Sequence, residues 1–210
     1  MSEVELHLGD CLEFMRGMAD KSVDAVITDP PYGVGLDYDK YSDTLDNWKN
    51  LFCEFVPEAR RVAKMVIMPS CQINMLGFIY SHYPPDWIIA WHKGSPGTNA
   101  YIGFNDWEPL LVYGKTDGLS MHDYFSVTNI EKKGEYGHPC PKPLRWATWL
   151  IERATKQDDT IMDCCMGSGT VGVGAVKTNR NFIGCELSQA YFAIAEKRIA
   201  QAQLQERMPL

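Results

Sequence analysis

The chain has 210 residues, of which 45% are hydrophobic and 22% are charged, and this size and composition fit one globular domain over residues 1–210 with a sizeable core. Its start is acidic and no run of about 18 apolar residues occurs, so we expect neither a signal peptide nor a membrane span and predict a cytoplasmic protein. The formal net charge of −7 is unusual for a protein that binds a polyanion, and the seven cysteines lack the spacing of a disulfide framework or a zinc site, so we expect no metal.

The first elements are a strand, a tight turn and a helix. Residues 3–8 alternate polar and apolar side chains, which predicts a half-buried strand. Gly9 and Asp10 then precede an apolar-periodic segment at residues 12–15, which predicts a short helix. Asp10 is a candidate cap for this helix, and a capping carboxylate can also lie near a ligand.

A proline-rich turn after the second predicted strand is the segment around which we interpret the rest of the chain. The β-branched run at residues 23–27 predicts a buried strand of a parallel sheet, and Asp29 follows its end. Pro30 and Pro31 restrict the backbone and remove two amide donors, so the carbonyl oxygens of Asp29 and Pro30 are left as acceptors. Tyr32 adds an aromatic face beside them. Such a turn suits a ligand that donates hydrogen bonds, although a Pro-Pro turn is often only a loop.

The middle of the chain predicts the remaining scaffold. Residues 34–47 are polar and rich in Asp and Tyr, which predicts a lid loop over a site. Further helices and strands follow: a helix at 48–62, a strand at 65–68, a weak helix at 74–83, and strands at 87–91 and 109–113. This alternation predicts an α/β fold with a Rossmann-like, mostly parallel sheet and helices on both faces. The last two strands have no helix between them, so we expect an antiparallel edge strand.

A segment without periodicity at residues 114–137 separates these strands from the last third of the chain. Lys132 and Lys133 lie in this segment and are candidate phosphate contacts; an ordinary surface excursion is the alternative. Residues 128–156 carry six basic and three acidic side chains, so a local basic face is compatible with an acidic chain. The Pro-rich residues 138–143 then lead into a predicted helix at 144–154.

A glycine turn late in the chain is the second strong signal. A predicted strand at residues 160–163 ends in Asp163, and the run Gly167-Ser168-Gly169-Thr170-Val171-Gly172 follows it as a Gly-x-Gly-x-x-Gly turn into an apolar helix. Glu186 ends the next predicted strand, 17 residues after Gly169, a spacing that suits hydrogen bonds to ribose hydroxyls. The motif alone equally suits NAD and a dehydrogenase. Asp163 favours a ligand with a cationic amine over a pyrophosphate, which a carboxylate would repel.

Three motifs together resemble one known family. Asp29-Pro30-Pro31-Tyr32 resembles the Asp/Asn/Ser-Pro-Pro-aromatic signature of S-adenosylmethionine-dependent amino-methyltransferases that act on nucleic-acid bases, the DPPY family. The His-Pro-x-x-Lys-Pro run at residues 138–143 and the glycine turn resemble two further family motifs. Trp91, Lys93 and Glu108 occupy the places of its Trp-x-Lys and Glu residues. The resemblance spans residues 6–198, with the catalytic motif first, as in the circularly permuted β group.

The resemblance implies S-adenosylmethionine as the cofactor, DNA as the partner, and Asp29, Pro30 and Tyr32 as the catalytic residues. It implies target recognition by residues 114–137, with Lys132 and Lys133 as DNA contacts. The cofactor site that we predict comprises Asp10, His138, Lys142, Asp163, Gly167, Ser168, Gly169, Thr170 and Glu186. The chain departs from the family at Cys165, where an aromatic residue is usual.

The chemistry of an exocyclic amine accounts for the catalytic turn. Its lone pair is delocalised into the ring, so acceptors at Asp29 and the Pro30 carbonyl would hold its hydrogens and favour a pyramidal nitrogen that attacks the sulfonium methyl in line. The base must first be flipped out of the duplex, with Tyr32 stacking on it.

Adenine N6 is the expected target, because Asp is commoner at the first position of the motif in the adenine enzymes of the family. Cytosine N4 and RNA are alternatives. The short recognition segment implies either a site of few base pairs or a homodimer. A nucleic-acid-binding or decoy protein with the same fold and low turnover is the non-enzymatic alternative.

Overall fold

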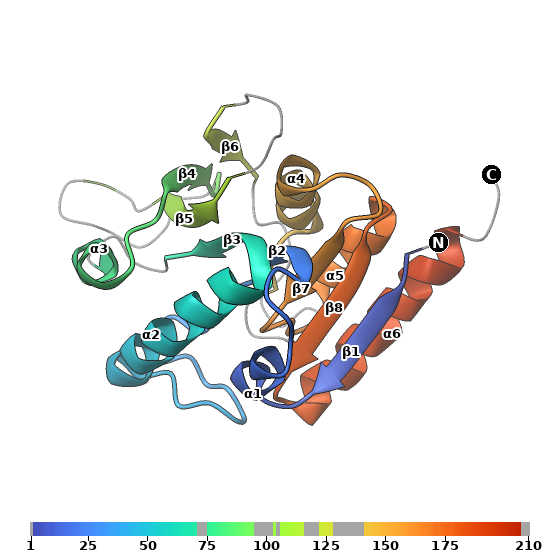
Figure 1. The fold of residues 1–210 in the computed structure, drawn as a ribbon, viewed down its shortest axis with the longest axis horizontal. Helices are drawn as coiled ribbons and strands as arrows, with labels where there is room; N and C mark the ends of the chain where they lie inside the picture. Colours follow the sequence, from blue (N-terminus) through green and yellow to red (C-terminus); the bar gives the residue numbers. More distant parts are fainter. Residues whose placement is uncertain are drawn as a thin grey trace.

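The computed structural model describes residues 2–70, 75–94, 103, 106–115, 122–127 and 141–206. Eight strands form one sheet in the order β1-β8-β7-β2-β3-β5-β4-β6 (Figure 1). The strands are β1 (Val4–Leu8), β2 (Val23–Ile27), β3 (Ala63–Pro69), β4 (Trp87–His92), β5 (Trp107–Gly114), β6 (Tyr124–Ser126), β7 (Thr160–Asp163) and β8 (Asn181–Glu186). The predicted α/β fold with a mostly parallel sheet is confirmed.

Helices cover both faces of the sheet, as predicted. The helices are α1 (Cys11–Arg16), α2 (Leu45–Val62), α3 (Leu76–His82), α4 (Leu144–Ala154), α5 (Thr170–Lys177) and α6 (Gln189–Glu206). Side chains of α1, α2 and α3 share one buried cluster, and those of α4, α5 and α6 share another. None of the helices that the structure describes is long and apolar enough to cross a membrane.

The antiparallel strand lies inside the sheet and not at its edge, which corrects our expectation. β5 runs antiparallel to both β3 and β4, and β6 then pairs parallel to β4 as the true edge strand. The expected antiparallel pairing between the strands at residues 87–91 and 109–113 is present as β4 and β5. β6 contains only three residues, Tyr124–Ser126, and a strand this short has no readable period. It lies within residues 114–137, where we had predicted no regular structure.

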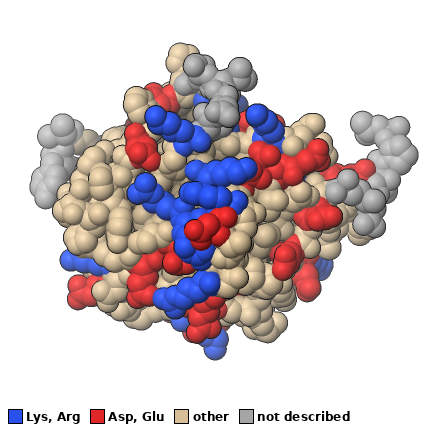
Figure 2. Space-filling view, in the orientation of Figure 1, with Lys and Arg blue, Asp and Glu red and all other residues tan. Residues whose placement is uncertain are grey.

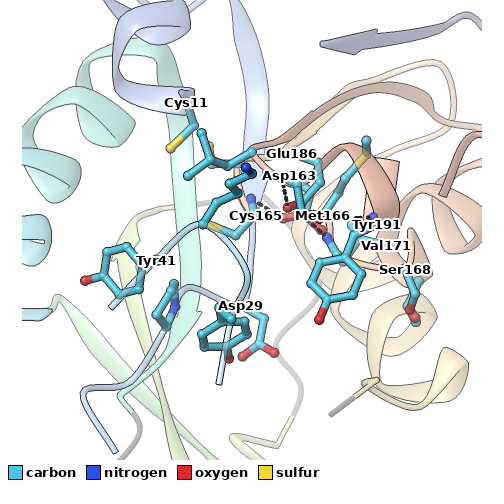
Figure 3. Close-up of a pocket in the computed structure, with 18 of the residues that line it drawn as sticks. Cys11, Asp29, Tyr41, Asp163, Cys165, Met166, Ser168, Val171, Glu186 and Tyr191 are labelled. Carbon is cyan, nitrogen blue, oxygen red and sulfur yellow. Dashed lines mark hydrogen bonds between the residues drawn. The ribbon is translucent and has the colours of Figure 1, made fainter. Parts of the chain in front are cut away.

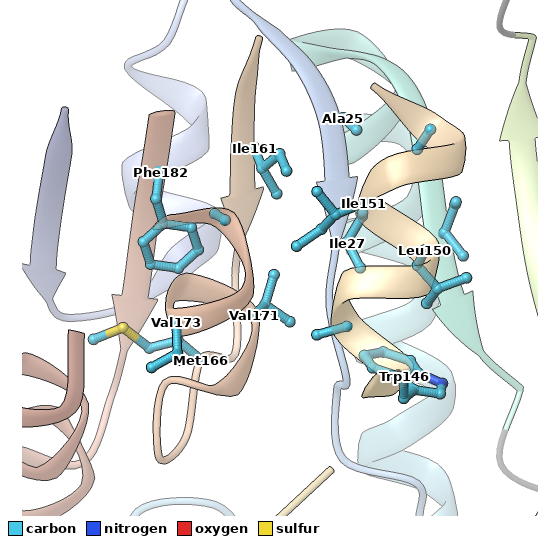
Figure 4. Close-up of a cluster of buried hydrophobic side chains, with 14 of the residues drawn as sticks. Ala25, Ile27, Trp146, Leu150, Ile151, Ile161, Met166, Val171, Val173 and Phe182 are labelled. Atoms are coloured by element: carbon cyan, nitrogen blue, oxygen red, sulfur yellow. The ribbon is translucent and has the colours of Figure 1, made fainter. Parts of the chain in front are cut away.

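The apolar pattern of the sequence explains how α4 and α5 pack. Figure 4 shows Trp146, Leu150 and Ile151 of α4 facing the sheet, with Val171 and Val173 of α5 beside them. All five side chains are buried in one cluster. This packing fixes α5, and therefore the glycine turn before it, at the carboxyl end of β7.

The strand order creates a crevice at the centre of the sheet. β2 and β7 are paired neighbours at the centre of the sheet. After β2 the chain adds β3 on one side of this pair, and after β7 it adds β8 on the other side. This reversal is the topological switch point at which open α/β sheets bind ligands, outside the carboxyl ends of the strands. The two strong sequence motifs follow these two strands. Although they are far apart in the sequence, the fold therefore brings them together.

Candidate active site

Four carboxylates stand at the carboxyl ends of four adjacent parallel strands. Asp10 follows β1, Glu186 ends β8, Asp163 ends β7, and Asp29 follows β2. All four line one cavity, and Figure 3 shows Asp29, Asp163 and Glu186 arranged around it. An acidic cavity of this kind favours a ligand that carries positive charge.

The glycine turn is held by the last residue of β8. Glu186 accepts a hydrogen bond from the Gly167 amide on Oε2 (2.8 Å) and one from the Ser188 amide on Oε1 (2.9 Å). Burial raises the pKa of Glu186, although these amides partly offset the effect. Gly169 caps α5 with φ of 82°, in the left-handed region that favours glycine. Glu186 therefore supports the turn that it faces and still has unused lone pairs toward the cavity.

Asp163 is a deeply buried carboxylate at the switch point. Its side chain is 2% exposed, and Oδ1 accepts hydrogen bonds from the Thr28 hydroxyl (2.7 Å) and the Cys165 amide (3.1 Å). Desolvation by burial raises the pKa of Asp163 to about 7, and the nearby Asp29 and Glu186 charges add to the effect. Thr28 joins β2 to β7 here, and sequence reasoning missed it. Its only signal was a hydroxyl side chain directly before Asp29.

The Asp29 turn carries an ion pair with a lysine from far along the chain. Asp29 accepts a hydrogen bond from the Tyr32 hydroxyl on Oδ1 and one from Lys142 Nζ on Oδ2 (2.6 Å). Lys142 is 8% exposed, and its Nζ atom also lies 3.0 Å from the Tyr32 oxygen and 5.1 Å from the centre of the Tyr32 ring. Lys142 lines the cavity, and its ammonium contacts the Asp29 turn, so a role in cofactor binding stays a prediction.

Glu108 completes a buried cluster behind Asp29. Burial raises the pKa of the Glu108 carboxyl, and its Oε2 atom lies 3.9 Å from Lys93 Nζ. Burial also raises the pKa of Tyr32, and its two carboxylate neighbours, Asp29 and Glu108, add to the rise. The sequence located Glu108 only as a family position, and the structure places its carboxyl near Tyr32 of the Asp29 turn.

The loop before α2 forms part of the cavity wall, and its role as a lid stays a prediction. Four consecutive loop residues line the cavity: Tyr38, Asp39, Lys40 and Tyr41. Asp39 Oδ2 accepts a hydrogen bond from Ser188 Oγ (3.0 Å), which connects the loop to the start of α6. Asp43 accepts three backbone hydrogen bonds, from the amides of residues 33, 34 and 36. The loop is shorter than predicted, because Thr44 caps α2 and residues 45–47 are helical.

The other predicted site residues fall into three groups. Asp10 caps α1 through the amides of Leu12 and Glu13, in addition to lining the cavity. Pro30 lies against α2 in a separate small cavity, so its ring does not line the main one. Lys132, Lys133 and His138 lie outside the described residues.

Three residues on the cavity wall have a buried polar atom without a hydrogen-bond partner among the described residues. The atoms are Thr170 Oγ1, in the first turn of α5, the Tyr41 hydroxyl of the loop, and Trp146 Nε1 of α4. Buried polar groups are normally hydrogen-bonded, so these atoms are available to a ligand that enters the cavity. Thr170 lies where a helix N-terminus attracts negative charge. The cavity thus combines an acidic wall with one anion-binding corner.

Comparisons with known proteins agree with this geometry. The N6/N4 methyltransferase family model, described as DNA methylase, matches residues 100–197. Type II methyltransferase M.HinfI of Haemophilus influenzae is 25% identical over 92% of this chain and 67% of its own length. Type II methyltransferase M2.DpnII of Streptococcus pneumoniae is 26% identical over 90% of this chain and 87% of its own.

Solved structures show the same fold. The PvuII DNA methyltransferase, cytosine-N4-specific, superposes with a TM-score of 0.73 at 17% identity and covers 98% of this chain and 93% of its own. The M1.HpyAVI complex with SAM gives a TM-score of 0.69 at 22% identity, covering 93% and 98%. The Asp29 turn and the glycine turn converge at one cavity, and together with this geometry the matches support an amino-methyltransferase of the N6/N4 type.

Proposed function

We propose that the protein transfers a methyl group from S-adenosylmethionine to the exocyclic amine of a flipped base in DNA, with adenine N6 as the target. One observation carries the proposal: the Asp29 turn and the acidic glycine-turn cavity meet at the switch point of the sheet. The type II methyltransferase relatives and the M1.HpyAVI–SAM complex support the reaction class and the cofactor.

The cavity residues fit this cofactor. S-adenosylmethionine supplies an electrophilic methyl group on a positively charged sulfonium, and it also carries an ammonium, a carboxylate and a ribose. Asp163 and the other strand-end carboxylates suit the positive charges, whereas Thr170 and the N-terminus of α5 suit the carboxylate. Glu186 has lone pairs left for ribose hydroxyls. Cys165 lines the cavity in place of the usual aromatic, so the cofactor ring would contact a thiol there.

Asp29 is the group that we assign to the target amine. Its Oδ2 atom binds Lys142 Nζ, a nitrogen donor, 2.6 Å away, and the same ammonium lies over the Tyr32 ring. A flipped base that donates its amine to Asp29 and stacks on Tyr32 would take these two contacts from Lys142. The lysine thus marks the place of the substrate amine. Flipping the base costs about a few kcal/mol, which contacts in this pocket offset.

The choice of base and the mode of DNA recognition belong to the same proposal. Asp at the first position of the Asp-Pro-Pro-Tyr motif favours adenine N6, and cytosine N4 is the alternative, supported by the cytosine-specific PvuII neighbour. We assign target recognition to residues 114–137, which include Lys132 and Lys133, with a homodimer as the way to enlarge the contact. The half-buried Asp29 and Tyr32 and the buried Asp163 are all held by hydrogen bonds, which favours an enzyme over a binding or decoy protein.

The test is methyl transfer from tritiated cofactor to in vitro-amplified DNA, which carries no methylated base. The modified base is then identified. Asp29→Ala should reduce single-turnover methyl transfer by at least about 10²-fold, the effect of removing one preorganised charge-stabilising group. Calorimetry should show cofactor affinity nearly unchanged. Glu54→Ala, on the exposed side of α2, is the matched control and should behave as the wild type. A wild-type rate in Asp29→Ala would refute the assigned role.

A further inference from the structure

A residue of the last helix contacts the glycine turn from outside the cavity. Arg198 lies on α6, and its Nη1 atom donates hydrogen bonds to the Ser168 carbonyl oxygen (2.5 Å) and to the Ser168 hydroxyl (2.9 Å). Ser168 is 3% exposed and lines the cavity, as Figure 3 shows, whereas Arg198 is half-buried and does not line it. The guanidinium therefore stands behind one residue of the cavity wall.

Close packing fixes α6 against the glycine turn. A Cβ at Gly169 would lie 2.9 Å from Ala195 Cβ and 3.3 Å from Ile199 Cδ1. Ala195 and Ile199 are both buried. Residues 195, 198 and 199 are three and four positions apart, so they share one face of the helix. This packing holds the backbone of Arg198 at a set distance from Ser168.

The hydrogen bond from Arg198 determines what the Ser168 hydroxyl can offer to a ligand. A serine hydroxyl has one hydrogen and two lone pairs, whereas a guanidinium can only donate. Arg198 is the only hydrogen-bond partner of this hydroxyl in the part of the chain that the structure describes. The Ser168 oxygen thus accepts from a cation, and its own hydrogen remains for an acceptor in the cavity. Accepting from a charged donor also polarises the hydroxyl and strengthens the bond that it donates.

Thr170 offers a second donor to the same corner of the cavity. Its side chain is 5% exposed, and its Oγ1 atom has no hydrogen-bond partner within the described residues. Thr170 is the first residue of α5, so free amide N–H groups and the positive end of the helix dipole lie here as well. Two hydroxyl donors beside a helix N-terminus suit a carboxylate, which is the one anionic group of S-adenosylmethionine.

The acidic wall makes a cation at this corner important for a carboxylate. The four strand-end carboxylates line the same cavity, and each of them repels a second negative charge. Arg198 brings a permanent positive charge to the donor corner, one hydrogen bond away from the cavity. Since the guanidinium does not line the cavity, its influence on a ligand passes through the Ser168 hydroxyl.

We propose that Arg198 is a positioning residue that makes the Ser168 hydroxyl a donor to the carboxylate of the bound cofactor. This inference rests on the proposed use of S-adenosylmethionine and adds a residue that the sequence motifs did not single out. The contribution of Arg198 to binding should therefore depend on the carboxylate of the ligand and not on its adenosine or its sulfonium.

The experiment measures the affinity of Arg198→Met for two ligands by calorimetry. One is S-adenosylmethionine, and the other is decarboxylated S-adenosylmethionine, which lacks the carboxylate and keeps the adenosine, the sulfonium and an ammonium. Arg198→Met should bind the first about tenfold more weakly than the wild type, the lower end for a hydrogen bond to a charged group. Its affinity for the decarboxylated ligand should be nearly unchanged.

Two further variants on α6 separate charge from position. Lys197→Met removes a positive charge from the neighbouring, exposed position and should bind both ligands as the wild type does. Arg198→Lys keeps the charge on a shorter side chain, so its loss of affinity for S-adenosylmethionine should be smaller than that of Arg198→Met. Ser168→Ala should show the same selective loss. Adding Arg198→Met to it should cost less than the product of the two single losses, because both act through one hydroxyl.

The proposal fails if Arg198→Met weakens both ligands equally, because the guanidinium would then only hold the turn. It also fails if the affinity for S-adenosylmethionine does not change, or if the losses of Ser168→Ala and Arg198→Met multiply. Should Arg198→Met not fold, Arg198→Lys must still weaken S-adenosylmethionine more than the decarboxylated ligand, or the assignment is wrong. A wild-type protein that binds neither ligand would instead refute the proposed function.

Discussion

Asp163 is a carboxylate that the fold buries at the carboxyl end of β7, next to two other strand-end carboxylates. Its folded-state pKa of about 7 lies above the ordinary value of 3.8. The folded protein therefore binds this proton more tightly than the unfolded chain does, and the contribution of Asp163 to stability falls as pH rises from about 4 to 7. Above pH 7 the ligand-free protein carries the full penalty of a buried negative charge, which a cationic ligand would relieve.

Asp163→Asn should separate stability from ligand binding. The amide oxygen can still accept from Thr28 and the Cys165 amide, but the buried charge is removed. At pH 8 the ligand-free variant should be more stable by about 1 kcal/mol or more, since each pKa unit corresponds to about 1.4 kcal/mol. Its affinity for S-adenosylmethionine should fall at least about tenfold. Denaturant unfolding at pH 5 and pH 8 and calorimetry measure these effects; a less stable variant at pH 8 would contradict the argument.

The helix that follows the glycine turn depends on close packing at one glycine. A Cβ at Gly172 would lie 2.7 Å from Phe182 Cε1 and 2.5 Å from Ile199 Cδ1, so β8 and α6 leave no room for a methyl group. Gly172→Ala should destabilise the protein by about 1–3 kcal/mol through overpacking. Gly174→Ala is the control in the same helix. Its Cβ would lie 3.1 Å from the flexible tip of Ile151, and the gain in helix propensity, up to about 1 kcal/mol, offsets the contact.

Denaturant unfolding of the two glycine variants measures the difference directly. Equal stabilities would show that α5 can shift away from β8 and α6, and that the third glycine of the turn is not needed for packing. A selective loss in Gly172→Ala should be accompanied by weaker cofactor binding, because α5 also positions Thr170 and the glycine turn.

Elements with a clear local period were predictable, and long-range side-chain pairs were not. The helix predicted at residues 144–154 matches α4, whose apolar face repeats at helical spacing. β6 is too short to show an alternation of polar and apolar residues. The position of β5 in the sheet depends on pairing with strands that are distant in the sequence, which no local pattern reveals. The site shows the same division. The motifs gave Asp29 and Asp163, but not the Lys142–Asp29 pair, whose partners lie 113 residues apart, or the Thr28–Asp163 bond across 135 residues.

At the scale of the whole molecule, acidic residues gather at the strand ends while the outer surface is mixed. Figure 2 shows Lys and Arg interspersed with Asp and Glu on the face in view. The chain as a whole has a net charge of −7, and four of its carboxylates line one cavity. Inside the cavity, the strand-end carboxylates should thus attract a cationic cofactor more strongly than an anionic one.

Salt should therefore distinguish the cofactor from its product. S-adenosylmethionine has a net positive charge, whereas S-adenosylhomocysteine has lost the sulfonium charge. Raising salt from about 0.05 to 0.5 M should weaken binding of the first by about two- to fivefold, because screening reduces attraction by the strand-end carboxylates. Binding of the second should change little. Calorimetry at both salt concentrations is the measurement, and parallel weakening of both ligands would show that the four carboxylates act only through short contacts.

If adenine is the target base, as proposed, the row of strand-end carboxylates also bears on which adenines can serve as substrates. A free nucleotide such as ATP offers the same exocyclic amine, but its phosphates would have to follow the base toward Asp29, Asp163 and Glu186. In a polymer the sugar–phosphate backbone can stay at the rim while the neutral base alone enters. The acidic cavity would thus exclude free nucleotides as substrates and limit methylation to bases carried by a nucleic-acid strand.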